Sequence, residues 1–164
     1  MKTTADLLTH VFVAFTAATL LSWKYDRIKS YHITAAMIGA TLPDLTRIGL
    51  ILDPGSIENT LKIPFSWSPL HTLGGSMMVV GILALLSNNR YREKIFLFLV
   101  LGLLSHLVLD IFLISTTGRI YGLLWPLPFK PYAPGFYLSI DVLPAIITGS
   151  TALFISKFRP DKTE

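Results

Sequence analysis

Long apolar stretches, separated by short basic or proline-rich segments, dominate the sequence. Each is close to the 20 or so residues that an α-helix needs to cross roughly 30 Å of hydrocarbon. The stretches lie at about residues 7–23, 32–52, 70–87, 95–116 and 137–156. This pattern predicts an all-α fold: a polytopic transmembrane bundle of about five helices, forming a single integral membrane domain over residues 1–164.

Two features interrupt the helical pattern. Residues 117–136 hold four prolines among tyrosine, tryptophan and phenylalanine, a composition that cannot continue a helix but can lie in the headgroup layer. We expect an irregular outer loop there, covering one end of the bundle. Pro43 falls inside the second stretch, so a kink or break is expected beside Asp44.

The composition excludes an ordinary soluble domain. The chain is 52% hydrophobic and only 15% charged, whereas soluble domains carry about 25% charged residues. The net charge of +4 would suggest nucleic acid as the partner of a soluble protein, but the basic residues gather at the segment ends, as membrane anchors do. We therefore expect membrane lipids as partners and no nucleic acid. The oligomeric state is open.

Lysine and arginine predict the orientation. Three follow the first stretch, three follow the third and three lie in the C-terminal tail: Lys24, Arg27, Lys29, Arg90, Arg92, Lys94, Lys157, Arg159 and Lys162. Because basic residues favour the cytoplasmic side, the N-terminus is expected outside and the C-terminus in the cytoplasm of a multi-pass cell-membrane protein.

His106 and Asp110 interrupt the fourth apolar stretch. Four residues apart on a helix is about one turn, so their side chains share a face. Titratable groups inside a membrane helix cost free energy and therefore suggest function. If the helix ends at residue 116, at about 1.5 Å per residue, Asp110 lies roughly 10 Å and His106 roughly 15 Å below its outer end.

Alternating helix directions bring further polar residues to the same outer half. The convergent set is His10, Asp44, His71, His106, Asp110 and Asp141. His32 falls at the inner end and is given no role. With no cysteine in the chain, imidazole and carboxylate are the ligands available, and they suit zinc, manganese or iron.

This set could hold one or two divalent ions. Asp44, His71, His106 and Asp110 would bind the first, and Asp110 could bridge to a second held with His10. Two close metals suit phosphoester hydrolysis. Cations near the site would bind the phosphate oxygens, and the candidates are Arg47, Lys62, Arg119 and Lys130. Asp141 could take or relay a proton.

At these residues the chain resembles a known family. Thr9-His10, GATLPD at residues 39–44, His71-Thr72 and SHLVLD at residues 105–110 are similar to the signature of the membrane-bound metal-dependent hydrolases of bacteria and archaea. The spacing also resembles that of zinc-dependent phospholipase C, an all-helical soluble fold with clustered zinc ions. The resemblance implies His10, Asp44, His71, His106 and Asp110 as metal ligands.

The chain departs from the family pattern at two places. Thr46 and Arg47 stand where the family commonly has an aspartate and a histidine, and residues 66–69 lack an Arg-Gly pair that often precedes the His71 position. Either change could alter metal content, substrate or catalysis.

Two other classes of function stay open. A metal or proton transporter could use the same ligands, but it would need a polar path through the inner half, where residues 11–22, 77–87 and 142–156 contain no ionisable group. A non-catalytic membrane scaffold could use the polar set only to tie helices together: Asp44 could neutralise Arg47, and His106 with Asp110 could be a structural contact.

Overall fold

The computed structural model describes residues 4–114, 122–128, 132 and 134–158. Within those residues the fold is all-α, as the sequence predicts. The α-helices are α1 (Thr4–Lys24), α2 (Ser30–Thr41), α3 (Pro54–Leu61), α4 (Leu73–Leu86), α5 (Arg92–Ile111) and α6 (Leu143–Lys157). Two 3-10 helices, η1 (Pro43–Leu50) and η2 (Ser68–His71), lie on either side of α3.

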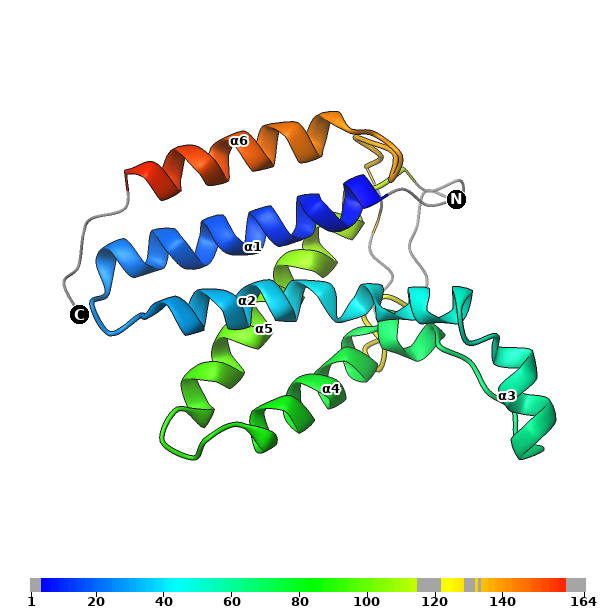
Figure 1. Cartoon of the computed structure of the whole chain (residues 1–164). Helices are drawn as coiled ribbons and strands as arrows, with labels where there is room; N and C mark the ends of the chain where they lie inside the picture. Colours follow the sequence, from blue (N-terminus) through cyan, green and yellow to red (C-terminus); the bar gives the residue numbers. More distant parts are fainter. Residues whose placement is uncertain (1–3, 115–121, 129–131, 133, 159–164) are drawn as a thin grey trace.

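The bundle is built around α1, α2 and α5. Helix α1 lies between α6 and α2, α5 crosses behind α2, and α4 packs on α5 from the other side (Figure 1). Helix α3 projects away from the bundle at the end where α2 stops and α4 begins (Figure 1). The bundle therefore has two distinct ends, joined by helices that alternate in direction.

The main core lies where α5 meets α4 and α2. Leu99, Leu103 and Leu107 recur every four residues along one face of α5 and pack with Val80 and Ala35. This spacing places them on a single stripe of the helix. The same stripe continues to His106 and Asp110, which are also buried, so the core positions the polar pair.

The second predicted helix is broken. Its α-helical part ends at Thr41, and a 3-10 helix starts at Pro43. Proline has no backbone N–H and clashes with the preceding turn, so it ends an α-helix and suits the first position of the next. The break expected beside Asp44 within the apolar stretch 32–52 is therefore confirmed.

Other boundaries also differ from the prediction. Helix α5 ends at Ile111 instead of residue 116, and α6 begins at Leu143 instead of residue 137. His71 ends η2 and precedes α4, whereas it was expected inside a helix over residues 70–87. Of the expected outer loop, residues 117–121, 129–131 and 133 lie outside the described residues; the described remainder up to residue 136 is irregular.

Two helices are long and apolar enough to cross a membrane. They are Leu7–Lys24 within α1 and Arg92–Ile111, which is α5, with mean hydropathies of 1.3 and 2.1. Helices α4 and α6 are apolar but have only 14 and 15 residues, which at 1.5 Å per residue is about 21–23 Å. The described helices therefore do not show the five full membrane crossings that the sequence predicts.

The two ends of the bundle differ in chemistry. One end carries basic side chains from the end of α1 and the loop to α2, from the turn before α5 and its first turn, and from the end of α6: Lys24, Arg27, Lys29, Arg90, Arg92, Lys94 and Lys157. The opposite end holds the start of α1, the end of α5, η1 and η2, and with them the histidines and aspartates expected to bind metal.

Candidate metal centre

His106 and Asp110 lie in the last two turns of α5, and both are buried. One helical turn brings His106 Nε2 to 3.2 Å from Asp110 Oδ2. Because α5 ends at Ile111, His106 lies only about 7–8 Å from the end of its helix at 1.5 Å per residue. The pair thus lies closer to the end of its helix than a helix running to residue 116 would place it.

His71 reaches the same carboxylate from a different element. Its Nε2 lies 3.0 Å from Asp110 Oδ2. Pro69 lies in the first turn of η2, the short 3-10 helix that carries His71. Thr72 caps the following α4 by accepting from the Gly75 N–H at 3.1 Å. This sharp change of direction turns His71 toward the end of α5.

His10 completes the buried set from α1. Its ring stacks on His106 with 3.7 Å between centroids, and its Nε2 lies 3.5 Å from Asp110 Oδ1. His10, His106 and Asp110 each offer a ligand atom within 4.8 Å of the others. A second group with the same property is Asp44, His71 and His106. The five residues implied as ligands are therefore brought together, with His106 common to both groups.

Backbone carbonyls fix the tautomers of two histidines. His106 Nδ1 lies 2.7 Å from the Ala40 carbonyl oxygen, and His71 Nδ1 lies 3.1 Å from that of Pro43. A carbonyl oxygen can only accept, so each Nδ1 carries the proton and donates it. In the neutral rings, both Nε2 lone pairs then face the Asp110 carboxylate, which is also an acceptor.

Acceptors that converge at about 3 Å need a cation between them, because their lone pairs repel each other, and burial of His106 and Asp110 makes the repulsion more costly. Either protons on the imidazoles or a metal ion supplies the charge. The carbonyl bonds favour the metal, since an Nδ1–H held by a backbone carbonyl is the usual outer contact of a histidine ligand.

The spacing of these atoms also suits a metal. Tetrahedral zinc with bonds of about 2.0–2.1 Å separates its ligand atoms by about 3.3 Å. The three distances to Asp110 are 3.0, 3.2 and 3.5 Å. The described donor set of nitrogen and oxygen thus fits a divalent ion in both chemistry and size.

Arg47 is paired with Asp44 instead of standing free beside a substrate. Its Nε lies 3.0 Å from Asp44 Oδ1, and its Nη2 lies 3.2 Å from Oδ2. Three residues apart on η1, the two side chains share a face. A carboxylate has about four lone-pair positions, so Asp44 can accept from Arg47 and still bind a metal.

The cluster is more open on the side of η1 and η2. The His71 side chain is 39% exposed, whereas those of His10 and His106 are 1% exposed. Burial alone lowers the pKa of His71, but the nearby Asp110 charge, to which a protonated ring would donate, outweighs it and raises the pKa. In the metal-free protein His71 therefore binds a proton more readily than an ordinary histidine does.

The remaining predicted residues lie elsewhere or outside the described chain. Asp141 precedes α6, and its Oδ2 accepts from the Leu138 N–H at 2.8 Å, a local turn contact. Lys62 is the exposed C-cap of α3. Arg119 and Lys130 lie outside the described residues.

Sequence reasoning missed the Ala40 and Pro43 carbonyls. The Ala40 carbonyl is available because α2 stops at Thr41, and the last carbonyls of a helix have no partner within it. Pro43 is the first residue of η1, and its carbonyl also accepts from Thr46 Oγ1 at 3.3 Å. The proline in GATLPD was the available signal: a helix broken one turn before Asp44 leaves acceptors free at that point.

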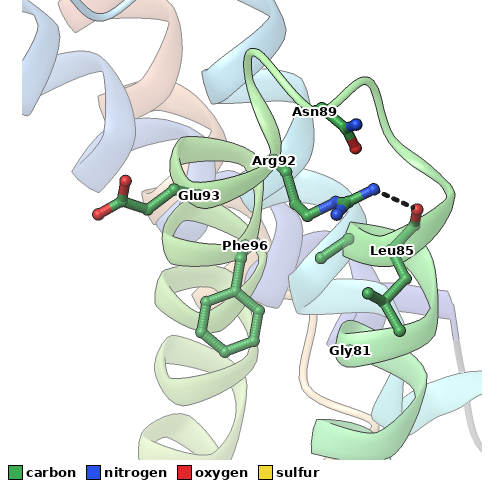
Figure 2. A pocket seen from close by; sticks show the side chains of 7 residues that line it. Gly81, Leu85, Asn89, Arg92, Glu93 and Phe96 are labelled. Atoms are coloured by element: carbon green, nitrogen blue, oxygen red, sulfur yellow. Dashed lines mark hydrogen bonds between the residues drawn. The ribbon is translucent and has the colours of Figure 1, made fainter.

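A separate pocket lies between α4 and α5 at the basic end (Figure 2). It measures about 420 Å³ and is lined by Gly81, Ala84, Leu85, Asn89, Arg92, Glu93 and Phe96. The Arg92 guanidinium donates to the Leu85 carbonyl at 3.1 Å. Fourteen residues separate Arg92 from His106, about 21 Å along α5, so this pocket is not part of the metal centre.

Comparison with protein-family models assigns nearly the whole chain to one family. The family model described as YdjM inner membrane protein matches residues 5–160. The chain belongs to the YdjM inner membrane protein family. The match covers the His/Asp cluster and both candidate spans, so the possible metal site lies within the part of the chain that belongs to the family.

YdjM proteins are a predicted family of membrane-bound metal-dependent hydrolases, which confirms that part of the resemblance. No curated protein and no solved structure matched the chain in the two other comparisons. The similarity to zinc-dependent phospholipase C stays a prediction.

Proposed function

We propose that this YdjM-family protein is a membrane-embedded, metal-dependent hydrolase that acts on a phosphoester, on a lipid or lipid-linked substrate. The observation that supports it is the geometry around Asp110. Two imidazole Nε2 atoms, held by backbone carbonyls through their Nδ1–H groups, face one carboxylate oxygen at 3.0 and 3.2 Å.

Each residue has a role in this proposal. His71, His106 and Asp110 hold the first divalent ion, most simply zinc, and His10 and Asp44 extend the site toward a second. A bound divalent ion lowers the pKa of water and polarises a phosphoryl oxygen. Arg47 orients Asp44, while Arg119 of the outer loop stays a candidate cation for the phosphate.

Access is expected from the side of η1 and η2, because the His71 side chain is the exposed member of the Asp110 set. The basic residues at the opposite end favour the cytoplasm. We therefore place the centre in the outer half of the membrane, with the N-terminus outside and additional crossings by the shorter apolar helices.

Metal analysis tests the proposal directly. Protein purified without chelator should carry stoichiometric metal, and His106→Ala and Asp110→Asn should lose both the metal and hydrolysis of simple phosphate esters. His32→Ala is the matched control, because His32 is equally buried but lies at the start of α2, at the other end of the bundle. Circular dichroism should show that all variants fold.

The outcomes separate the competing classes. Full phosphatase activity in either ligand variant would overturn the proposal. Wild-type protein without metal would favour a scaffold, whereas metal uptake by reconstituted vesicles without ester hydrolysis would favour a transporter.

A further inference from the structure

Residues 50–67, called the α3 arm, run from Leu50, the last residue of η1, through α3 to the start of η2. In the described part of the chain, α3 makes no extensive contact with another helix, and it projects from the bundle at the metal end (Figure 1). An element with so few tertiary contacts needs another source of order, because packing supplies most of the stability of short helices.

The arm exposes large apolar side chains outside both candidate spans. Leu50 and Ile51 are 88% and 84% exposed, and Leu61 and Ile63 are more than half exposed. Leaving such side chains in water forgoes the free energy of burying them. Four of them on one short arm indicate an apolar environment around it.

The arm is nevertheless a defined structure. Asp53 caps α3 by accepting from the Ser56 N–H at 2.8 Å. Trp67 Nε1 donates to the Leu52 carbonyl at 3.0 Å, which closes the arm at its base, and the Phe65 ring packs edge-on against Trp67 at 4.8 Å. These contacts fix the chain that follows Leu50 and Ile51.

Both ends of the arm lead directly into the metal centre. Asp44 and Arg47 lie in η1, just before the arm, and His71 lies in η2, just after it. The two 3-10 helices are joined by the contact of His71 Nδ1 with the Pro43 carbonyl. Whatever fixes the arm therefore also fixes the open side of the cluster.

We propose that the α3 arm seats in the headgroup and upper acyl region of the phospholipid leaflet at the metal end, and so holds the open side of the centre where a membrane phospholipid can reach it. This inference rests on the proposed function for its substrate class. A lipid surface fits better than a protein partner, because the arm continues a membrane-embedded bundle and mixes apolar side chains with a half-buried tryptophan and Lys62, as interfacial segments do.

The absence of cysteine from the sequence allows a clean labelling test. Ile51→Cys and the matched control Asn59→Cys, a polar exposed position on α3, are each labelled with an environment-sensitive fluorophore in phosphatidylglycerol and phosphatidylethanolamine vesicles. Nitroxide lipids should quench the label at position 51 and aqueous iodide should quench the label at position 59. Equal iodide quenching of both would overturn the proposal, as would protection of position 51 that disappears when the protein is diluted to one copy per vesicle.

Kinetics separate this inference from the proposed function. The double variant Leu50→Asn, Ile51→Asn should raise KM for a vesicle-borne phospholipid by at least about tenfold. The reason is that burying one aliphatic side chain contributes more free energy than a tenfold change in KM represents. Its turnover of soluble p-nitrophenyl phosphate and its metal content should be unchanged. If the wild-type protein hydrolyses neither substrate, the proposed function fails and the quenching result still decides the placement of the arm. If the double variant lost activity equally on the phospholipid and on p-nitrophenyl phosphate, the lipid-specific role of the α3 arm would be overturned.

Discussion

Gly102 of α5 lies directly against the backbone of Ala36 in α2. A Cβ placed on Gly102 would overlap the Ala36 carbonyl oxygen, and one placed on Gly39 would overlap the backbone of Leu99. The two helices approach this closely because neither glycine has a side chain. One turn further along, the same approach brings the Ala40 carbonyl to His106 Nδ1 at 2.7 Å.

Substituting Gly102 should therefore damage a metal site that it does not touch. Gly102→Val forces α2 away from α5, and overpacking of this kind typically costs about 1–3 kcal/mol. We expect a lower melting temperature and weaker metal binding, measured by thermal unfolding and by competition with a metal-binding dye.

Gly81→Ala is the matched control, because a Cβ at that position of α4 meets nothing within 4 Å. It should bind metal normally and gain up to about 1 kcal/mol in stability from helix propensity. Unchanged metal affinity in Gly102→Val would show that the close approach does not support His106.

Arg47→Ala should weaken metal binding. Arg47 contacts both oxygens of Asp44, and losing a partner that orients a ligand typically reduces metal affinity by about 10–100-fold. Competition titration measures this directly, with Lys62→Ala, an exposed position at the end of α3, as a control for removing a positive charge away from the cluster. If Arg47→Ala raises only KM for a phosphate ester and leaves metal affinity intact, Arg47 acts on the substrate instead.

The stability of the metal-free protein should depend on pH through His71. Its pKa is raised in the folded state, so its contribution is fully present below the unfolded pKa and is lost as pH rises through the folded pKa. The difference in melting temperature between chelator-treated wild type and His71→Gln should shrink with increasing pH.

With metal bound the trend should reverse, because protons compete with the metal for His71. A difference that grows with pH in the metal-free protein would contradict the assignment of Asp110 as the partner of His71.

The variant Asp141→Asn distinguishes between two roles for Asp141, a proton relay and a local turn contact. The carboxylate accepts from the Leu138 N–H, and an asparagine oxygen can replace it in that role. We expect nearly normal hydrolysis in Asp141→Asn and a loss of about 0.5–2 kcal/mol in Asp141→Ala, as for other capping side chains. A large fall in kcat for Asp141→Asn, with metal retained, would support the relay predicted from the sequence.

Much of the site follows from local sequence. The spacing from His106 to Asp110 puts both side chains on one helical face whatever the rest of the chain does. Pro43 required a break before Asp44, and the alternation of apolar segments placed His10, His71 and Asp110 at one end. The basic residues at the opposite end were readable in the same way.

Helix lengths and pairings depended on tertiary contacts. An apolar run continues past Ile111, but the chain leaves the helix there: the Ile114 N–H donates to the Tyr137 carbonyl at 2.9 Å, and the Phe136 N–H donates to the Phe112 carbonyl at 2.9 Å. A hydropathy pattern cannot predict this helix end, because hydropathy describes side chains and contains no information about backbone hydrogen bonds to other segments.

The sequence by itself determined the residue types, the helical face of the His106 and Asp110 pair and the end of the bundle at which ligands gather. Only the tertiary structure decided that the Ala40 and Pro43 carbonyls orient the imidazoles, and that the α3 arm stands clear of the bundle. The physical reason is the distance along the sequence over which each effect acts. Periodicity and proline act within a few residues, whereas the long-range contacts join groups up to 66 positions apart and form only once the helices have packed.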